Sequence, residues 1–182
     1  MFIDYVTLML VNMAAGFFVL AGFLTRKEGE PTQPWAPVFA LVGLVALITG
    51  FRMTFTWPLP GSYNVAFGEL SALFGGLMFA TAGSLAKGLD LKPVALYGFF
   101  AGLVAIVVGA QFLRLGLSKT PLLTGIGFLL AGIAGLGAYP TVRCDCRKFR
   151  LAGAVVLVFS GLIWAFIGYN AYWLHIANFM KR

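Results

Sequence analysis

Six long apolar segments, separated by short polar turns, constrain this chain more than any other feature. Each segment has about the 20 residues that a helix needs to cross the roughly 30 Å hydrocarbon core of a bilayer. They cover the ranges 5–24, 36–56, 62–86, 93–113, 121–139 and 151–173. A water-soluble domain could not cover this much apolar surface, because hydrophobic residues make up 60% and charged residues 10% of the chain. We therefore expect an all-α membrane protein, a six-transmembrane-helix bundle that forms one domain over 1–182.

Prolines and glycines mark the expected helix ends and contacts. Pro93 suits the first turn of the fourth helix, where Asp90 can accept hydrogen bonds from free backbone N–H groups. Pro140 is expected to close the fifth helix, because an interior proline removes a backbone donor. Glycines at helix-packing spacing, among them Gly98 and Gly102, predict close contact between helices in lipid.

The distribution of basic residues predicts the orientation in the membrane. The net charge of +7 comes from 13 Lys and Arg against six Asp and Glu. The turns after the first, third and fifth helices hold eight of these basic residues, and the opposite side holds five. Basic turns favour the cytoplasmic side, so we expect a multi-pass protein of the cytoplasmic membrane with both termini outside. The basic residues form no nucleic-acid-binding motif, and we expect no nucleic acid as a partner.

The few chemically reactive side chains argue against an enzyme. One histidine and two cysteines cannot supply four metal ligands, so we expect no metal and no cofactor. The sequence shows no nucleophile–base pair, and we expect no catalytic residues. Cys144 and Cys146 fall on the predicted cytoplasmic side, where thiols stay reduced. We expect them to be a plain pair in a turn, with a metal or redox role as the alternative.

Polar groups within or beside the apolar segments are the candidates for function, since such groups are costly in a membrane. With the orientation above they all fall in the outer half of the bundle, which predicts a water-filled vestibule that opens outward. The candidate solute-binding residues are Asn12, Arg52, Tyr63, Asn64, Glu69, Asn170 and His175.

Arg52 and Glu69 are the oppositely charged pair among these candidates and the most informative one. They flank a short turn that holds Pro58 and Pro60, so the two charges are expected at similar depth on neighbouring antiparallel helices. One interpretation is an ion pair that fixes the outer turn, and the other is a site that binds solute or relays protons. Tyr63 and Asn64 either face the vestibule or cap the third helix. His175 is either an ordinary interfacial residue or a pH sensor.

Two resemblances follow from short motifs. The run TWPLPGSYN at 56–64, followed by Gly68 and Glu69, resembles an uncharacterised family of small six-helix prokaryotic membrane proteins, which implies no activity. The turn GLDLKP at 88–93, with Tyr97 and Phe100, is similar to the urea and amide channels. That resemblance implies a ring oligomer, often of six protomers, with one pore for a small neutral solute in each. Leu91 replaces the tryptophan of that motif, and the histidine-rich loops used for acid gating are absent.

These observations predict a channel or facilitator for a small polar solute such as urea, an amide or a weak acid. Selectivity by pore width and lining donors needs no cofactor. The alternative is a non-catalytic accessory subunit of a larger membrane complex, for example a respiratory one. Both functions place the chain in the lipid bilayer, either as a homo-oligomer or among other subunits.

Overall fold

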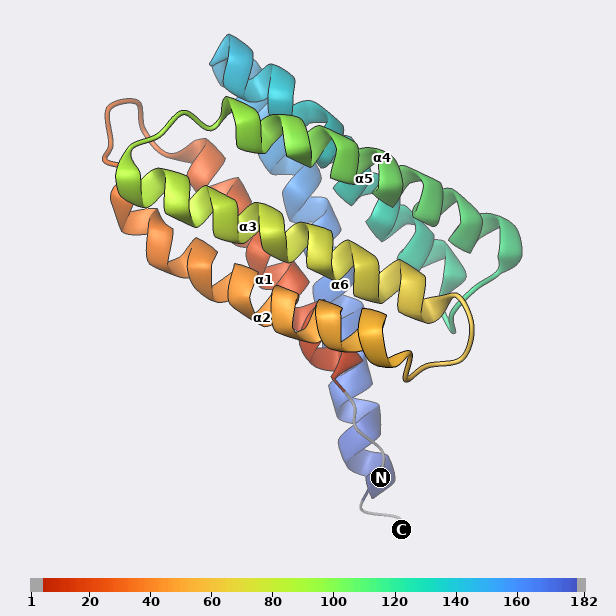
Figure 1. Ribbon diagram of the computed structural model, residues 1–182. Coiled ribbons are helices and arrows are strands. Elements are labelled where there is room, and N and C mark those ends of the chain that lie inside the picture. The colour runs from red at the N-terminus through yellow and green to blue at the C-terminus, as the bar shows by residue number, and fades with distance from the viewer. Residues whose placement is uncertain (1–4, 180–182) are drawn as a thin grey trace.

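The computed structural model describes residues 5–179, and this part of the chain is almost entirely helical (Figure 1). Its six long helices are joined by short turns, and each is long and apolar enough to cross a membrane. The predicted all-α, six-helix bundle is confirmed in these terms. The helices are α1 Val6–Thr25, α2 Ala36–Thr56, α3 Leu70–Lys87, α4 Lys92–Leu115, α5 Pro121–Cys144 and α6 Arg147–Phe179.

Helix ends agree best with the prediction where the chain carries a strong stop signal. The bounds of α2 are the predicted ones, and Trp57, with φ of 47°, turns the chain into the left-handed region before Pro58. Gly88 ends α3 in the same way, with φ of 65°. Asp90 Oδ1 accepts from the Lys92 N–H at 2.9 Å, which confirms the expected role at the start of α4. This hydrogen bond lowers the pKa of Asp90 below that of a free aspartate.

The ends of α5 and α6 correct the prediction. Pro140 lies inside α5, which continues to Cys144 instead of closing at 139. The proline removes one backbone donor, but the rest of a long membrane helix keeps its hydrogen bonds. The Asp145 N–H donates to the Thr141 carbonyl at 3.1 Å, so the last turn is complete. Helix α6 extends beyond the predicted 151–173 at both ends.

A π-helical segment, Asn64–Glu69, leads directly into α3, where the sequence predicted an ordinary helix. Asn64 is fully buried at its start, and its side chain holds the preceding turn. The amide oxygen accepts from the Leu59 N–H at 2.9 Å, and the amide nitrogen donates to the carbonyls of Leu59 and Gly61. A wide helical turn of this kind is usually a single local bulge.

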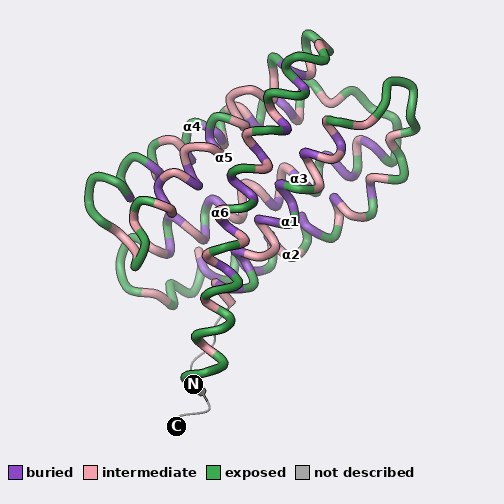
Figure 2. The backbone as a smooth tube through the Cα atoms, turned by 180° about the vertical axis from the view of Figure 1, so that it is seen from behind, coloured by how far each residue is buried: buried purple, intermediate pink, exposed green. Residues whose placement is uncertain are grey.

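The helices pack mainly as three antiparallel pairs, α1 with α6, α2 with α3 and α4 with α5 (Figures 1 and 2). Helix α5 also packs on α6, which joins the α4–α5 pair to the rest of the bundle. The C-terminal part of α6 extends past the other helices, and its side chains there are mostly exposed (Figure 2).

Glycines let the paired helices approach closely, as the sequence predicted. A Cβ atom added to Gly102 of α4 would lie 2.7 Å from the Gly132 carbonyl oxygen of α5. A Cβ atom on Gly75 of α3 would lie 2.6 Å from the Leu47 nitrogen of α2. Because both obstacles are backbone atoms, no side-chain movement could relieve them.

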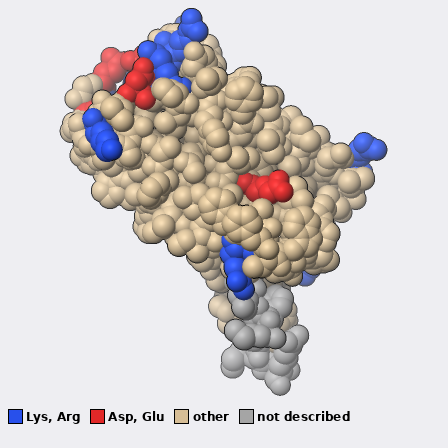
Figure 3. Space-filling view, in the orientation of Figure 1, with Lys and Arg blue, Asp and Glu red and all other residues tan. Residues whose placement is uncertain are grey.

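The outer surface is apolar around the middle of the bundle. Figure 3 shows Lys, Arg, Asp and Glu mostly towards the ends, with a broad uncharged area between them. Large apolar side chains are exposed on this surface, for example Leu41 at 61%, Val107 at 62% and Phe159 at 59%. So much exposed apolar area is unusual for a soluble monomer and is what lipid contact requires.

Candidate functional site

A large apolar cavity lies between α3, α4 and α5, with α1 and α6 behind it, and we call it the cleft. Its volume is about 310 Å³, within the range of small-molecule sites. Small residues on α4 leave the space, and larger side chains of α1 and α3 bound it. Prominent lining residues are Met13, Phe17 and Leu20 of α1, Leu70, Leu73 and Leu77 of α3, Ala95, Gly98, Ala101 and Ala105 of α4, and Phe128 and Ala134 of α5.

The polar side chains in the lining of the cleft are two threonines. The Thr81 hydroxyl donates to the Leu77 carbonyl of its own helix at 2.8 Å, and Thr141 is buried. Among residues 5–179, no charged residue lines the cleft. The cleft therefore offers contact to hydrocarbon and very little to a solute that needs hydrogen bonds.

An aromatic cluster fills the bundle at one end of the cleft. Phe128, in the lining, contacts Phe67, Phe112 and Trp164, with ring centroids 4.7–5.6 Å away. Tyr63 stacks beyond them on Phe67, and its hydroxyl accepts from the Ser118 N–H at 3.1 Å. These contacts connect Phe128 of the cleft lining to the α2–α3 and α4–α5 turns.

The opposite end of the cleft reaches a basic surface. Leu91, Thr141 and Phe149 line the cleft near the α3–α4 and α5–α6 turns. The chain segments at this end of the bundle carry eight Lys and Arg against four Asp and Glu. Those next to the lining residues, and exposed, are Lys87, Lys92, Arg143, Arg147 and Lys148.

The predicted site residues lie outside the cleft, and none of the seven belongs to its lining. Asn12 donates to the Val42 carbonyl at 3.0 Å and links α1 to α2. Asn64 is the buried residue of the α2–α3 turn, and Tyr63 ties that turn to the α4–α5 turn. Asn170 is exposed and donates to the Phe166 carbonyl at 2.9 Å. His175 Nδ1 lies 3.5 Å from the Thr7 hydroxyl, which connects α6 to α1.

Arg52 and Glu69 are both exposed and do not pair with each other. Within residues 5–179 the ion pair present is Lys92–Asp90, at 3.3 Å. The interpretation of Arg52 and Glu69 as an ion pair that fixes the turn is therefore wrong for the single chain. Asn64 holds the turn instead. Figure 3 shows an isolated acidic patch over α3, in the otherwise uncharged middle of this face.

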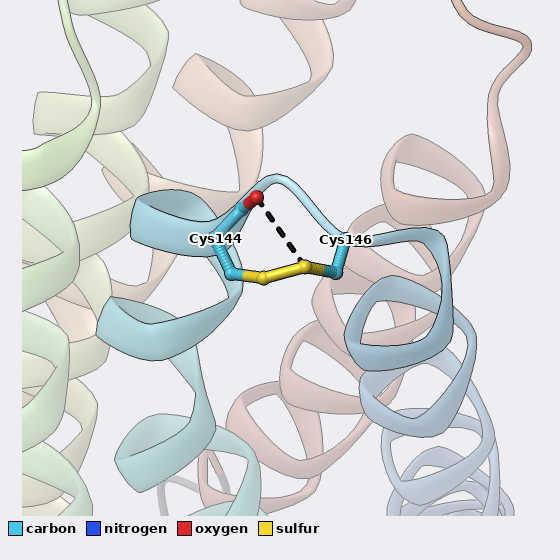
Figure 4. The surroundings of a disulfide bond; sticks show 2 residues. All are labelled: Cys144 and Cys146. Carbon is cyan, nitrogen blue, oxygen red and sulfur yellow. Dashed lines mark hydrogen bonds between the residues drawn. A yellow bond between two sulfur atoms is a disulfide. The ribbon is translucent and has the colours of Figure 1, made fainter.

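Sequence reasoning missed two features. The cleft follows from small residues spaced along one side of α4, opposite leucines of α3, where the sequence predicts helix packing alone. These small residues are Ala95, Gly98, Ala101, Gly102 and Ala105. The second feature is the α5–α6 turn, where Cys144 and Cys146 form a disulfide (Figure 4). The expectation of two reduced thiols is corrected here. Asp145, with φ of 49°, folds the chain back and brings the two Cα atoms to 5.1 Å.

The six long helices of residues 5–179, five of which line an apolar cleft, define the class, an all-helical protein whose helices are long and apolar enough to cross a membrane. The family described as "Protein of unknown function (DUF981)" matches residues 1–178, and the chain belongs to this family. The resemblance to an uncharacterised family is thus confirmed. No curated protein and no solved structure matches the chain, so the similarity to urea and amide channels gains no support.

Proposed function

We propose that this membrane protein binds one hydrocarbon chain of an anionic lipid in the cleft, with the lipid headgroup at the basic end. The observation that carries the proposal is the uncharged, almost wholly apolar lining of a cavity of about 310 Å³. Buried apolar area is favourable at roughly 25 cal/mol per Å², so a hydrocarbon chain gains from entering. A polar solute would lose hydrogen bonds to water without replacement.

The charge around the cleft selects the headgroup. Lys87 and Lys92 flank the α3–α4 turn, and Arg147 and Lys148 begin α6 near the lining residue Phe149. Each basic residue near an anionic membrane surface contributes about 1 kcal/mol of attraction. A phosphate group at this end would therefore be held while its chain occupies the cleft.

Native mass spectrometry of the purified, delipidated protein, titrated with phosphatidylglycerol, tests the proposal. We expect one tightly bound lipid per chain. Ala101→Phe fills the cleft and should weaken binding about tenfold, a loss of about 1.4 kcal/mol. The matched control is Val107→Phe on the same helix, which is exposed and outside the lining. Equal binding by both variants, or no bound lipid in the parent protein, would contradict the proposal.

The headgroup part of the proposal has its own control. Lys92→Ala lies at the basic end, and Lys119→Ala removes an exposed charge at the opposite end of the bundle. Only Lys92→Ala should weaken phosphatidylglycerol relative to phosphatidylethanolamine. Equal effects of the two lysine variants would remove the basic end from the site.

The placement in the membrane is proposed from the charge count. Eight basic residues at the cleft's basic end, against five at the other, support a cytoplasmic membrane location with both termini outside. Two of those five, Lys181 and Arg182, lie outside the described residues. The basic end would then meet the cytoplasmic leaflet, where anionic lipids attract polybasic segments.

A second proposal concerns partners. Arg52 and Glu69 lie within membrane-length helices, are exposed, and form no ion pair with each other. Exposed charges of this kind are costly against lipid. We infer that a second copy of the chain covers this surface, with Arg52 of one protomer facing Glu69 of the other. In a two-fold symmetric contact of this kind, each Arg52–Glu69 pair would form twice.

The channel for a small polar solute and the accessory-subunit role stay predictions. A channel requires that the protein alone in liposomes speeds urea-driven swelling, and that Glu69→Gln or Asn12→Leu changes the rate. An accessory subunit requires co-purification with larger partners and no flux.

A further inference from the structure

The α5–α6 turn places two sulfur atoms in bonding position at the surface of the bundle. Cys144 ends α5, Asp145 makes the left-handed turn, and Cys146 precedes α6 (Figure 4). The Cα separation of 5.1 Å falls in the normal range for a disulfide. Cys144 is exposed and Cys146 is half-buried, so an external thiol can approach the pair from water.

The surroundings of Cys146 favour its thiolate. The Cys146 carbonyl accepts from the Arg150 N–H at 3.1 Å, which places Cys146 at the N-terminus of α6. Helix N-termini and neighbouring cations both stabilise a thiolate. The exposed cations beside it are Arg147 and Lys148, with Arg143 at the end of α5, and they outnumber the one neighbouring carboxylate, Asp145. Cys146 is therefore the better leaving group when the bond is cleaved.

We propose that Cys144 and Cys146 form a reversible dithiol–disulfide couple that exchanges with thiols at the membrane surface. The thiolate of an external dithiol attacks Cys144 Sγ, the S–S bond breaks, and Cys146 leaves as a thiolate. The second external thiolate then attacks the sulfur of its own chain in the mixed disulfide and releases Cys144. Two electrons and two protons pass to the cysteine pair, and the external dithiol becomes a disulfide.

The proposed orientation of the chain in the membrane is compatible with the couple. On the proposed orientation the turn faces the cytoplasm, where disulfides are usually transient and catalytic or redox-sensing. The proposal does not depend on lipid binding in the cleft, because both cysteines lie at the α5–α6 turn and neither lines the cleft.

Thiol trapping of the full chain in proteoliposomes tests the couple. The protein is equilibrated in glutathione buffers from fully reduced to fully oxidised, quenched with acid, denatured and tagged with maleimide–polyethylene glycol. The chain holds two cysteines, so each tag reports on this pair alone. We expect a reversible change between two tags and none, without a one-tag plateau. Cys144→Ser and Cys146→Ser should each carry one tag in reduced buffer.

A rate measurement tests the role of the surroundings. In the Cys144→Ser background, the alkylation rate of Cys146 at pH 7 should fall about threefold when Arg147 and Lys148 are both changed to Gln. Changing Lys119 to Gln, at the opposite end of the bundle, should leave the rate unchanged.

Two outcomes would overturn the proposal. The first is a pair that stays as two thiols in oxidised glutathione. The second is a disulfide that resists reduced glutathione until the protein is denatured, which would make it a permanent structural bond. Neither outcome affects the lipid-binding measurement, so the two proposals fail separately.

Discussion

Arg150 is a residue whose role could not be inferred from the sequence and is clear in the structure. In the sequence it is one of several charges in a basic turn. In the structure it belongs to α6, is 7% exposed, and donates to the end of α1. Its Nε bonds the Leu24 carbonyl at 2.9 Å and its guanidinium bonds the Arg26 carbonyl at 2.7 Å. The last carbonyls of a helix have no partners within the helix, so this side chain supplies them.

We predict that Arg150→Met destabilises the protein by about 2–3 kcal/mol, because buried carbonyls lose charge-assisted hydrogen bonds. Unfolding by titration with dodecyl sulfate in mixed micelles, followed by circular dichroism, measures the change. Arg143→Met removes an exposed charge from the end of α5 and should change stability by less than about 0.5 kcal/mol. If the two variants unfolded at the same dodecyl sulfate content, the contacts of Arg150 would contribute nothing measurable to the stability of the protein.

Asn64 makes a related point about a predicted site residue. An asparagine next to a membrane segment is a reasonable solute ligand, and its amide has donors and an acceptor for that purpose. In the structure these groups bond to the backbone at Leu59 and Gly61, and the side chain is fully buried. A sequence does not reveal which polar groups are already satisfied by the backbone nearby.

At the scale of the helices, adjacent glycines of α3 have opposite roles. A Cβ atom on Gly75 would lie 2.6 Å from the Leu47 nitrogen and 2.9 Å from the Gly43 oxygen, both in α2. A Cβ atom on Gly76 would have nothing within 4 Å. One glycine therefore sets the distance between two helices, and the next does not.

This difference gives a matched pair of variants. We predict that Gly75→Ala costs about 1–3 kcal/mol, since α2 and α3 must separate to admit the methyl group. Gly76→Ala should leave stability unchanged or raise it by up to about 1 kcal/mol, because alanine is the better helix former. Thermal unfolding of the two variants in the same detergent tests the prediction, and a loss at Gly76 equal to that at Gly75 would contradict it.

Helix ends follow the same logic. Turns that need a residue with a left-handed backbone conformation, such as those at Gly88 and Gly116, can be recognised in a sequence, because glycine adopts that conformation without strain. The interior position of Pro140 could not be predicted from the sequence. The free-energy cost of an interior proline depends on whether the surrounding helix continues to pack. The π-helical segment 64–69, which begins at the buried Asn64, could not be predicted from the sequence either.

At the scale of the whole molecule, the proposed contact between two copies predicts a charge-swap pattern. Arg52→Glu and Glu69→Arg should each shift the protein in detergent towards the monomer, because like charges would then face each other. The double variant restores opposite charges and should restore the oligomer. Mass photometry of the four proteins measures the shift.

Two results would exclude this interface. One is a monomeric parent protein at all concentrations. The other is a double variant no more associated than the single ones, since self-complementary charges must tolerate the exchange. Both results leave the lipid-binding cleft unaffected, because neither Arg52 nor Glu69 lines it.

Apolar segments of membrane length, proline-marked turns and packing glycines were enough to determine six helices, most of their ends and the class of protein. These are local properties, since a span needs only enough consecutive apolar residues and a turn needs only the right backbone conformation. The family assignment rests on the same sequence.

Tertiary structure alone decided which polar groups are engaged and where an empty space remains. The cleft exists because small residues of α4 lie opposite leucines of α3, and the Cys144–Cys146 bond exists because Asp145 turns the chain back. Both depend on distances between atoms that composition and periodicity do not contain. A cavity is what close packing of particular helices leaves unfilled, so it is defined only when all of those helices are in place.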